Sequence, residues 1–249
     1  MTYERFAYLY DQLMEDMPYE KWVELTDYYG KKHQITGKKL LDLACGTGEL
    51  SYRFASSGYE VTGIDLSSDM LAIAKAKTEE AGFHIPFYQQ NMAELEGLET
   101  FDYITIFCDS INYLSNEQEV VDTLEGAYKH LSNQGLFLFD VHSEFKMEHI
   151  FKNQTFTLND ENLCYIWNCF EGEFPLSVEH ELTFFVKDAT SEKYDRIEEY
   201  HFQRTFAINQ YIKWLEQAGF ETLHILGDLE HQSPTMESER ILFIAKKKS

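Results

Sequence analysis

Residues 40–50 read Leu40-Leu41-Asp42-Leu43-Ala44-Cys45-Gly46-Thr47-Gly48-Glu49-Leu50, and they are the most informative segment of the chain. A hydrophobic strand runs into an acidic residue, two glycines flank a single residue, and a helix then begins. Gly46 and Gly48 have no Cβ, so they can adopt positive φ and let a ligand approach the main chain. The pattern predicts the tight strand–turn–helix of an α/β protein that binds a ligand at the turn.

A second strand of the same kind follows. Residues 61–65, Val-Thr-Gly-Ile-Asp, predict a short strand that ends in the carboxylate of Asp65. An acid at the tip of the second strand of a parallel sheet is suited to bind both hydroxyls of a ribose. We therefore expect a nucleoside-containing ligand at the carboxyl ends of the first two strands.

Strand and helix patterns alternate from residue 39 to residue 141, which predicts a parallel sheet with right-handed crossovers. A helix and two more strands close the chain. The predicted strands of this sheet are 39–44, 59–64, 84–88, 101–107, 135–141, 220–226 and 241–245, and the helices between them are 49–56, 69–81, 116–130 and 208–218.

Two other segments depart from this alternation. Residues 3–29 carry an amphipathic helical stripe that Pro18 interrupts. Residues 151–206 show little helical periodicity, and turn residues divide them into strand-like runs, which predicts an antiparallel insertion. The predicted strands of the insertion are 156–158, 164–170, 179–187 and 198–206.

The chain of 249 residues holds 43 Asp and Glu against 21 Lys and Arg, which gives a formal net charge of −22. A surface this acidic repels phosphate backbones, so the composition argues against nucleic acid and against anionic membranes as partners. The length fits one large α/β domain or a domain with an insertion.

The four cysteines form no CxxC pair and match no zinc pattern, so we expect reduced thiols, no metal and a cytoplasmic location. The first 17 residues carry early acids and no long apolar segment, which argues against a signal peptide. No apolar run approaches the ~20 residues that a membrane span needs.

The ordered set of motifs resembles that of class I S-adenosylmethionine (SAM)-dependent methyltransferases. Asp42 precedes Gly46-Thr47-Gly48, and Asp65 ends the second strand. Gln90-Asn91-Met92 then follows the third strand and Asp109-Ser110 the fourth. The resemblance covers residues 38–145 closely and 207–246 in outline. The opening segment and the runs at 108–114 and 139–143 resemble a bacterial subgroup whose substrates are unassigned.

The resemblance implies an α/β fold of the Rossmann-like, doubly wound type. Its mostly parallel sheet would have seven strands in the order 3-2-1-4-5-7-6, with an antiparallel β insertion after strand five. Residues 1–36 would form an N-terminal helical lid, residues 37–145 and 207–249 the SAM-binding domain, and residues 146–206 an inserted subdomain on the substrate side.

The resemblance also implies the residues that contact SAM. Asp42 would reach the methionine amine, Asp65 would accept from the ribose hydroxyls, and Leu66 would pack on the adenine. The family often has an acid where this chain has Asn91, whose side-chain carbonyl can accept from the adenine amino group in the same way. The full set of expected cofactor contacts is Tyr3, Tyr10, Asp42, Ala44, Cys45, Gly46, Asp65, Leu66, Asn91, Met92, Cys108 and Asp109.

Several of these residues have structural interpretations that stay open. Asp42 can serve only to set the turn, since strand-end acids often bind backbone amides. Asn91 can be a turn residue of its loop. Tyr3 and Tyr10 can pack in a core instead of covering the cofactor.

His142 and Asp109 are the candidates for a general base. Histidine titrates near neutrality, and His142 follows the fifth strand, on the side where the methyl acceptor is expected. The alternative is that His142 is a surface or capping residue. His201 and Glu199, in the insertion, are weaker candidates of the same kind.

The sequence thus predicts an enzyme that transfers a methyl group from SAM in line to an oxygen or nitrogen of a small molecule. The acceptor would lie over strands four and five, under the insertion and the N-terminal helix, and the chain could form a homodimer. An inactive SAM-binding regulator is the alternative. A nicotinamide oxidoreductase is disfavoured, because the fingerprint G-x-G-x-x-G would need glycine where the chain has Ser51.

Overall fold

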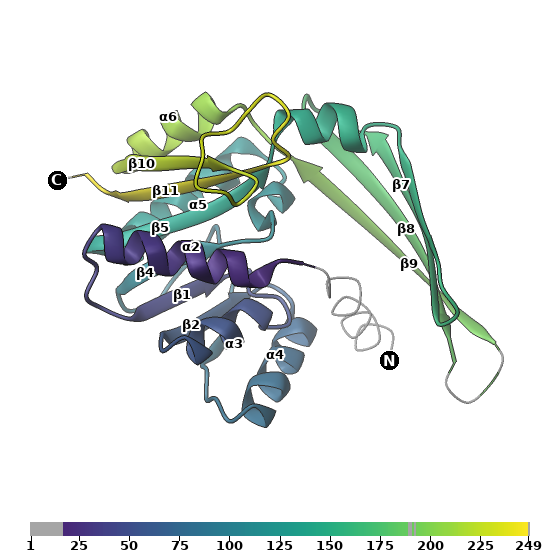
Figure 1. Ribbon diagram of the computed structural model, residues 1–249, viewed down its shortest axis with the longest axis horizontal. Helices are drawn as coiled ribbons and strands as arrows, with labels where there is room; N and C mark the ends of the chain where they lie inside the picture. The colour runs from purple at the N-terminus through teal and green to yellow at the C-terminus, as the bar shows by residue number, and fades with distance from the viewer. Residues whose placement is uncertain (1–16, 189–190, 192, 249) are drawn as a thin grey trace.

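The computed structural model describes residues 17–188, 191 and 193–248. Its larger sheet has seven strands in the order β10-β11-β5-β4-β1-β2-β3, in which β11 runs in the opposite direction to the other six (Figure 1). The predicted order is confirmed, with β11 and β10 in the places of strands seven and six. The strands are β1 (Lys39–Leu43), β2 (Glu60–Asp65), β3 (Phe87–Gln89), β4 (Phe101–Ile106), β5 (Leu131–His142), β10 (Phe220–Gly227) and β11 (Arg240–Lys247).

Five α-helices accompany this sheet in the described part of the chain, and local chemistry sets their ends. The Ser67 hydroxyl accepts from the Met70 amide at 3.3 Å, and the Asn116 carbonyl accepts from the Glu119 amide at 3.0 Å. Both side chains therefore cap the first turns of their helices. The helices are α2 (Tyr19–Lys32), α3 (Glu49–Ser56), α4 (Ser68–Glu80), α5 (Glu117–His130) and α6 (Ile208–Ala218).

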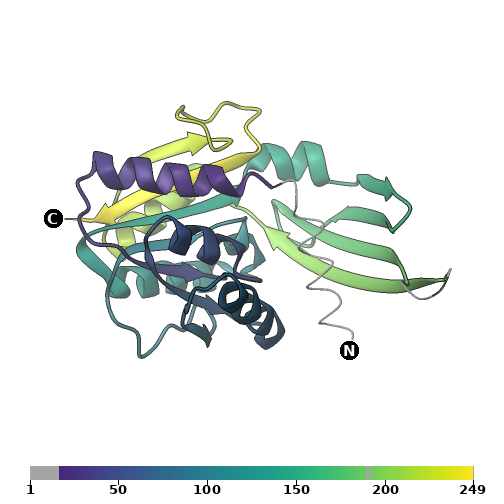
Figure 2. The same cartoon turned by 60° about the horizontal axis from the view of Figure 1, so that its bottom comes forward.

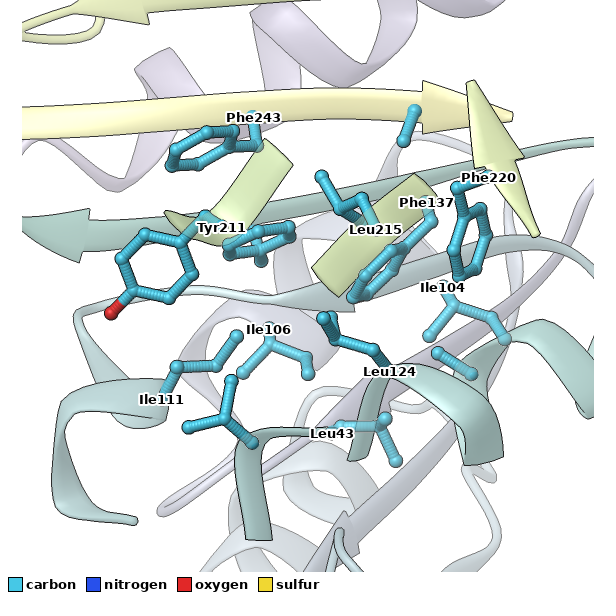
Figure 3. Close-up of a cluster of buried hydrophobic side chains, with 14 of the residues drawn as sticks. Leu43, Ile104, Ile106, Ile111, Leu124, Phe137, Tyr211, Leu215, Phe220 and Phe243 are labelled. Atoms are coloured by element: carbon cyan, nitrogen blue, oxygen red, sulfur yellow. The ribbon is translucent and has the colours of Figure 1, made fainter. Parts of the chain in front are cut away.

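Side-chain alternation along the strands separates two apolar layers. On one face, Leu40 and Leu138 pack with Trp22 of α2 and Phe54 of α3. The other face packs against α5 and α6, with side chains from β1, β4 and β5 meeting both helices in one continuous cluster (Figure 3). The sheet is thus covered on both sides, and its polar carboxyl edge is left for a ligand.

An antiparallel sheet of four strands, ordered β6-β7-β8-β9, follows β5 and projects to one side of the larger sheet (Figures 1 and 2). This confirms the predicted insertion. One face of this sheet is apolar, with Phe184 and Ile197 buried, while Glu181 and Tyr200 on the other face are exposed. The strands are β6 (Thr155–Asn159), β7 (Leu163–Glu171), β8 (Ser177–Lys187) and β9 (Tyr194–Arg204).

The structure differs from the sequence predictions mainly at short elements. A 3₁₀ turn, η1 (Ser110–Tyr113), and a π-helical segment, η2 (Lys146–Phe151), were not predicted. Strand β3 begins at Phe87 instead of residue 84, since Pro86 has no amide hydrogen to pair. Residues 3–16 of the predicted N-terminal helix lie outside the described residues. Within the part that the structure describes, no helix is long and apolar enough to cross a membrane.

Truncation of Phe139 to alanine should lower the free energy of unfolding by about 3–5 kcal/mol, because the side chain is fully buried and the cavity cannot be refilled. Its ring stacks on Phe137 at 5.1 Å and on Phe243 at 4.8 Å between centroids. Urea unfolding of both proteins measures the loss. Met236→Ala, at a side chain that is 92% exposed, is the control; equal losses for the two variants would contradict the assignment of the core.

Candidate functional site

The turn after β1 has a left-handed backbone at three positions. Gly46 and Gly48 have φ of 53° and 75°, and Ala44 joins them in the left-handed region at 55°. A Cβ on Gly48 would lie 2.8 Å from the Cβ of Ala74 on α4, so this position needs glycine for packing as well as for its φ. A Cβ on Gly46 would meet open space, and this space lies where a cofactor can reach the main chain.

Asp65 joins this turn to the start of α4. One carboxylate oxygen accepts from the Gly46 amide at 2.8 Å and the other accepts from the Ser67 amide at 2.8 Å. Burial raises the pKa of Asp65 above its ordinary value, although these amides oppose the effect. Each oxygen keeps a further lone pair, so the carboxylate can still accept from two hydroxyls.

The expected adenine residues lie beside Asp65. Leu66 is 66% exposed, which is unusual for a large apolar side chain and leaves a surface on which a flat ring can pack. The side-chain carbonyl of Asn91 accepts from the Ala93 amide at 3.0 Å. The turn role that was left open for Asn91 is therefore present, and its side-chain amide still offers donors. Met92 packs against the core.

Asp42 is buried at the back of the site. Its carboxylate accepts from the Ser51 hydroxyl at 2.6 Å and from the Thr105 hydroxyl at 3.2 Å. Burial raises the pKa of Asp42 to about 6, because these two hydroxyls compensate only part of the lost hydration. The carboxyl group thus lacks a positive partner among the described residues in contact with it.

These elements enclose a pocket between the turn after β1 and the loop after β4. It brings together the expected residues Asp42, Ala44, Cys45, Gly46 and Cys108. The other lining residues were not among the expected cofactor contacts. They are Tyr19, Thr47, Glu49, Leu50, Phe107 and Ser110.

The loop after β4 has an unusual backbone. Cys108 and Asp109 are consecutive, neither is glycine, and both have φ of 55°. Their amides donate to the two carboxylate oxygens of Asp140 at 2.9 and 3.0 Å. Two successive amides that converge on one anion stabilise a conformation that would otherwise be costly. Trp22 on α2 donates its indole N–H to the same carboxylate at 2.9 Å.

Asp140 was not predicted as a site residue, although it is fully buried. One sequence feature could have identified it: Asp140 is the single acid in the otherwise apolar segment Leu136–Val141. A charge buried in such a strand needs hydrogen-bond or ionic partners. Those partners come from the loop after β4, from α2 and from Arg240 of β11, whose guanidinium contacts both Asp140 and Asp109.

The structure brings the two candidate bases together. Asp109 accepts from Nε2 of His142 at 3.2 Å and from Nη2 of Arg240 at 2.9 Å. It also accepts from the side-chain amide of Gln203 on β9 at 3.0 Å. Burial alone would raise the pKa of Asp109, but His142 and Arg240 hold it well below its usual range. Gln203 and Arg240 carry no sequence motif, so only the fold shows that they belong here.

Other candidates lie outside this group. Tyr3 and Tyr10 fall outside the described residues. His201 makes an edge contact with the ring of Tyr113, and Glu199 is half-buried. No cluster of three metal ligands exists in residues 17–188, 191 and 193–248.

Comparison with known proteins agrees with this geometry. Residues 40–135 match a family model described as a methyltransferase domain. A protein of Geobacillus sp. (strain WCH70) is 52% identical over 99% of this chain and all of its own length, and one of Bacillus subtilis (strain 168) is 42% identical over 99% of this chain and 98% of its own. Both carry provisional names as methyltransferases.

Solved structures share the fold. A SAM-dependent methyltransferase from Clostridium acetobutylicum superposes with a TM-score of 0.91 at 27% identity, and each chain is covered to 99%. DesVI from Streptomyces venezuelae shows the same fold at a TM-score of 0.80, with 19% identity and 98% of each chain covered. The chain therefore belongs to the class I SAM-dependent methyltransferases, enzymes that take the transferred methyl group from this cofactor.

Proposed function

We propose that this enzyme methylates an oxygen or nitrogen of a small molecule. The main supporting observation is that the loop after β4 contacts both the pocket beside the glycine turn and the group of polar side chains around Asp109. The Cys108 end of the loop lines the pocket beside the glycine turn, and the Asp109 end contacts His142 and Gln203. A cofactor on one side of this loop and an acceptor on the other would be aligned for in-line transfer.

The residues present fit SAM. Asp65 would bind the ribose hydroxyls, Leu66 and Met92 would contact the adenine, and Asp42 would face the positively charged methionine end. The open space over Gly46 lets the cofactor pass close to the main chain. When bound, SAM supplies an electrophilic methyl group on a sulfonium, and the protein contributes alignment and charge around it.

The proposed acceptor side lies between the carboxyl ends of β4 and β5 and the antiparallel sheet. We therefore propose that residues 37–145 and 207–249 form a SAM-binding domain and that residues 146–206 form an insertion on the substrate side.

A net charge of −22 supports a small acceptor over a nucleic acid. An N,N-dimethyltransferase of Streptomyces fradiae that acts on a dTDP-linked amino sugar is 31% identical over 44% of this chain, which supports the same class. The four free thiols support the cytoplasm as the location.

The proposal is tested by transfer of label. Purified protein, incubated with [methyl-³H]SAM and the low-molecular-weight fraction of a bacterial extract, should produce a labelled small molecule. Label in the macromolecular fraction of a whole extract, with none in small molecules, would overturn the proposed substrate class. Label in neither fraction, with SAM bound, would favour the inactive regulator.

Replacement of Asp65 by alanine should weaken SAM binding tenfold or more, since about 1–3 kcal/mol is expected for hydrogen bonds to a charged group. Isothermal titration calorimetry with SAM measures the change. Asp69→Ala, an exposed acid in the first turn of α4, is the matched control. Unchanged affinity in a folded Asp65→Ala protein would refute the ribose role.

SAM should bind more tightly as the pH rises from 5 to 7 and no more tightly above that. The pKa of Asp42 is raised to about 6, so the carboxyl group is protonated below this pH and ionised above it. A cationic ligand favours the ionised form, so binding below pH 6 releases a proton and affinity changes by up to about tenfold per pH unit.

Calorimetry of SAM binding at several pH values, in buffers of different ionisation enthalpy, measures both the affinity and the released proton. Asp42→Asn should weaken binding and flatten the pH dependence. A flat profile in the unmodified protein would show that Asp42 does not face the charged end of the cofactor.

A further inference from the structure

A chain of hydrogen bonds runs from the antiparallel sheet to Asp109, and its direction is fixed. The indole of Trp167 can only donate, and it donates to Nδ1 of His180 at 3.0 Å. The proton of neutral His180 therefore sits on Nε2, which lies 3.1 Å from the side-chain carbonyl of Gln203. This orients the Gln203 amide so that its nitrogen donates to Oδ2 of Asp109 at 3.0 Å.

The same carboxylate oxygen fixes the tautomer of His142. An ionised Asp109 can only accept, so the proton of neutral His142 sits on Nε2, 3.2 Å from Oδ2. Nδ1 of His142 then carries a bare lone pair. It is buried, and it has no hydrogen-bond partner among the described residues. A buried acceptor without a partner costs about 1–3 kcal/mol, and such groups in native proteins call for an explanation.

Asp109 and His142 are unequal as bases. Asp109 accepts from Arg240, Gln203 and His142, and its pKa is held well below its usual range, so it takes up a proton poorly. Burial lowers the pKa of His142 below 6.5, and Lys146 and Arg240 add to this while Asp109 opposes it. His142 is thus neutral at pH 7, with one nitrogen held by a carboxylate and the other bare.

We propose that His142 accepts, on Nδ1, the proton that the methyl acceptor loses, and that Gln203 and His180 are positioning residues for Asp109. This rests on the proposed function and specifies it, because the acceptor must then be a hydroxyl or a protonated amine. In the step, the nucleophile forms a bond to the methyl carbon and the carbon–sulfur bond breaks with its electron pair on sulfur. A hydroxyl passes its proton to Nδ1 as the new bond forms, whereas a protonated amine must pass its proton first, because its nitrogen has no free lone pair until then. Asp109 balances the charge of the protonated imidazole.

The proposal also requires movement of one short segment. Phe151 of η2 meets the imidazole of His142 edge-on, with 5.2 Å between the ring centroids, and also contacts the His180 ring at 5.1 Å. An acceptor reaches Nδ1 only if η2 shifts. This segment is a single π-helical turn between the two sheets, a type of element that is frequent at functional sites.

Nuclear magnetic resonance of the full chain labelled with ¹⁵N-histidine tests the geometry without any acceptor. At pH 7.5, with S-adenosylhomocysteine present, His142 should be neutral with its proton on Nε2, and its signals are assigned by their loss in His142→Gln. A charged His142, or a proton on Nδ1, would overturn the proposal, whatever the outcome of the labelling experiment.

The methyl-transfer experiment separates this inference from the function on which it rests. His142→Gln should bind SAM as the unmodified protein does and lose about 10²-fold or more in transfer of label to the small-molecule fraction, the usual contribution of a general base. His84→Gln, at an exposed histidine outside these elements, is the matched control and should transfer at the original rate. Equal rates of transfer by the unmodified protein and by His142→Gln would show that His142 is not the general base. The proposed function would remain intact.

The pH profile distinguishes positioning from a structural role. The charged or titratable groups that act on His142 are Asp109, Lys146 of η2, Arg240 of β11 and His180 of β8. The pKa of His180 is lowered to about 4, mainly by burial, so His180 stays neutral over the range used.

Transfer should rise with pH as His142 loses its proton, with a midpoint below 6.5. Gln203→Leu should move this midpoint and lower the rate less than His142→Gln does. An unmoved midpoint in a folded Gln203→Leu protein would show that the hydrogen-bond chain is only structural.

Discussion

The carboxylate of Asp140 is the contact on which the geometry of the site depends. It is completely buried and gathers donors from α2, from the loop after β4 and from β11. A charge in this position is tolerated only when it is paired and fully hydrogen-bonded. Removal of one partner would leave buried charge without compensation, which is strongly destabilising. Asp140 therefore makes the position of each of these three elements depend on the other two.

The loop after β4 shows why such an anchor is needed. Two consecutive non-glycine residues with positive φ cost of order 1–3 kcal/mol each, and they persist only where the surroundings impose them. The converging amides of Cys108 and Asp109 on Asp140 impose this conformation. As a result, the Cys108 end of the loop reaches the pocket beside the glycine turn, while the Asp109 carboxylate contacts His142 and Gln203.

The sequence predicted the features that depend on local residue patterns, such as helix ends. It predicted few of the contacts between residues that lie far apart along the chain. Helices α3 and α6 begin and end at the predicted residues, and the caps at Ser67 and Asn116 follow from residue type. The contacts of Arg240 with Asp140 and Asp109 join residues 100 and 131 positions apart, so no window of sequence contains them. The roles of Gln203 and His180 depend in the same way on how the antiparallel sheet meets the larger one, and η2 lacks a periodicity that predicts a π-helix.

Three aspartates at neighbouring strand ends show how the fold divides its charge. Asp42 and Asp65 receive hydrogen bonds from hydroxyls and amides, and burial raises the pKa of both. Asp109 has a guanidinium beside it, and its pKa is lowered. The proposed cofactor side thus holds negative charge that a cationic sulfonium nucleoside would balance, whereas the carboxylate on the proposed acceptor side already has the Arg240 guanidinium beside it. Under the proposed mechanism, a proton released on that side would meet a neutral imidazole before an uncompensated carboxylate, so that these different surroundings would give the same residue type two separate tasks.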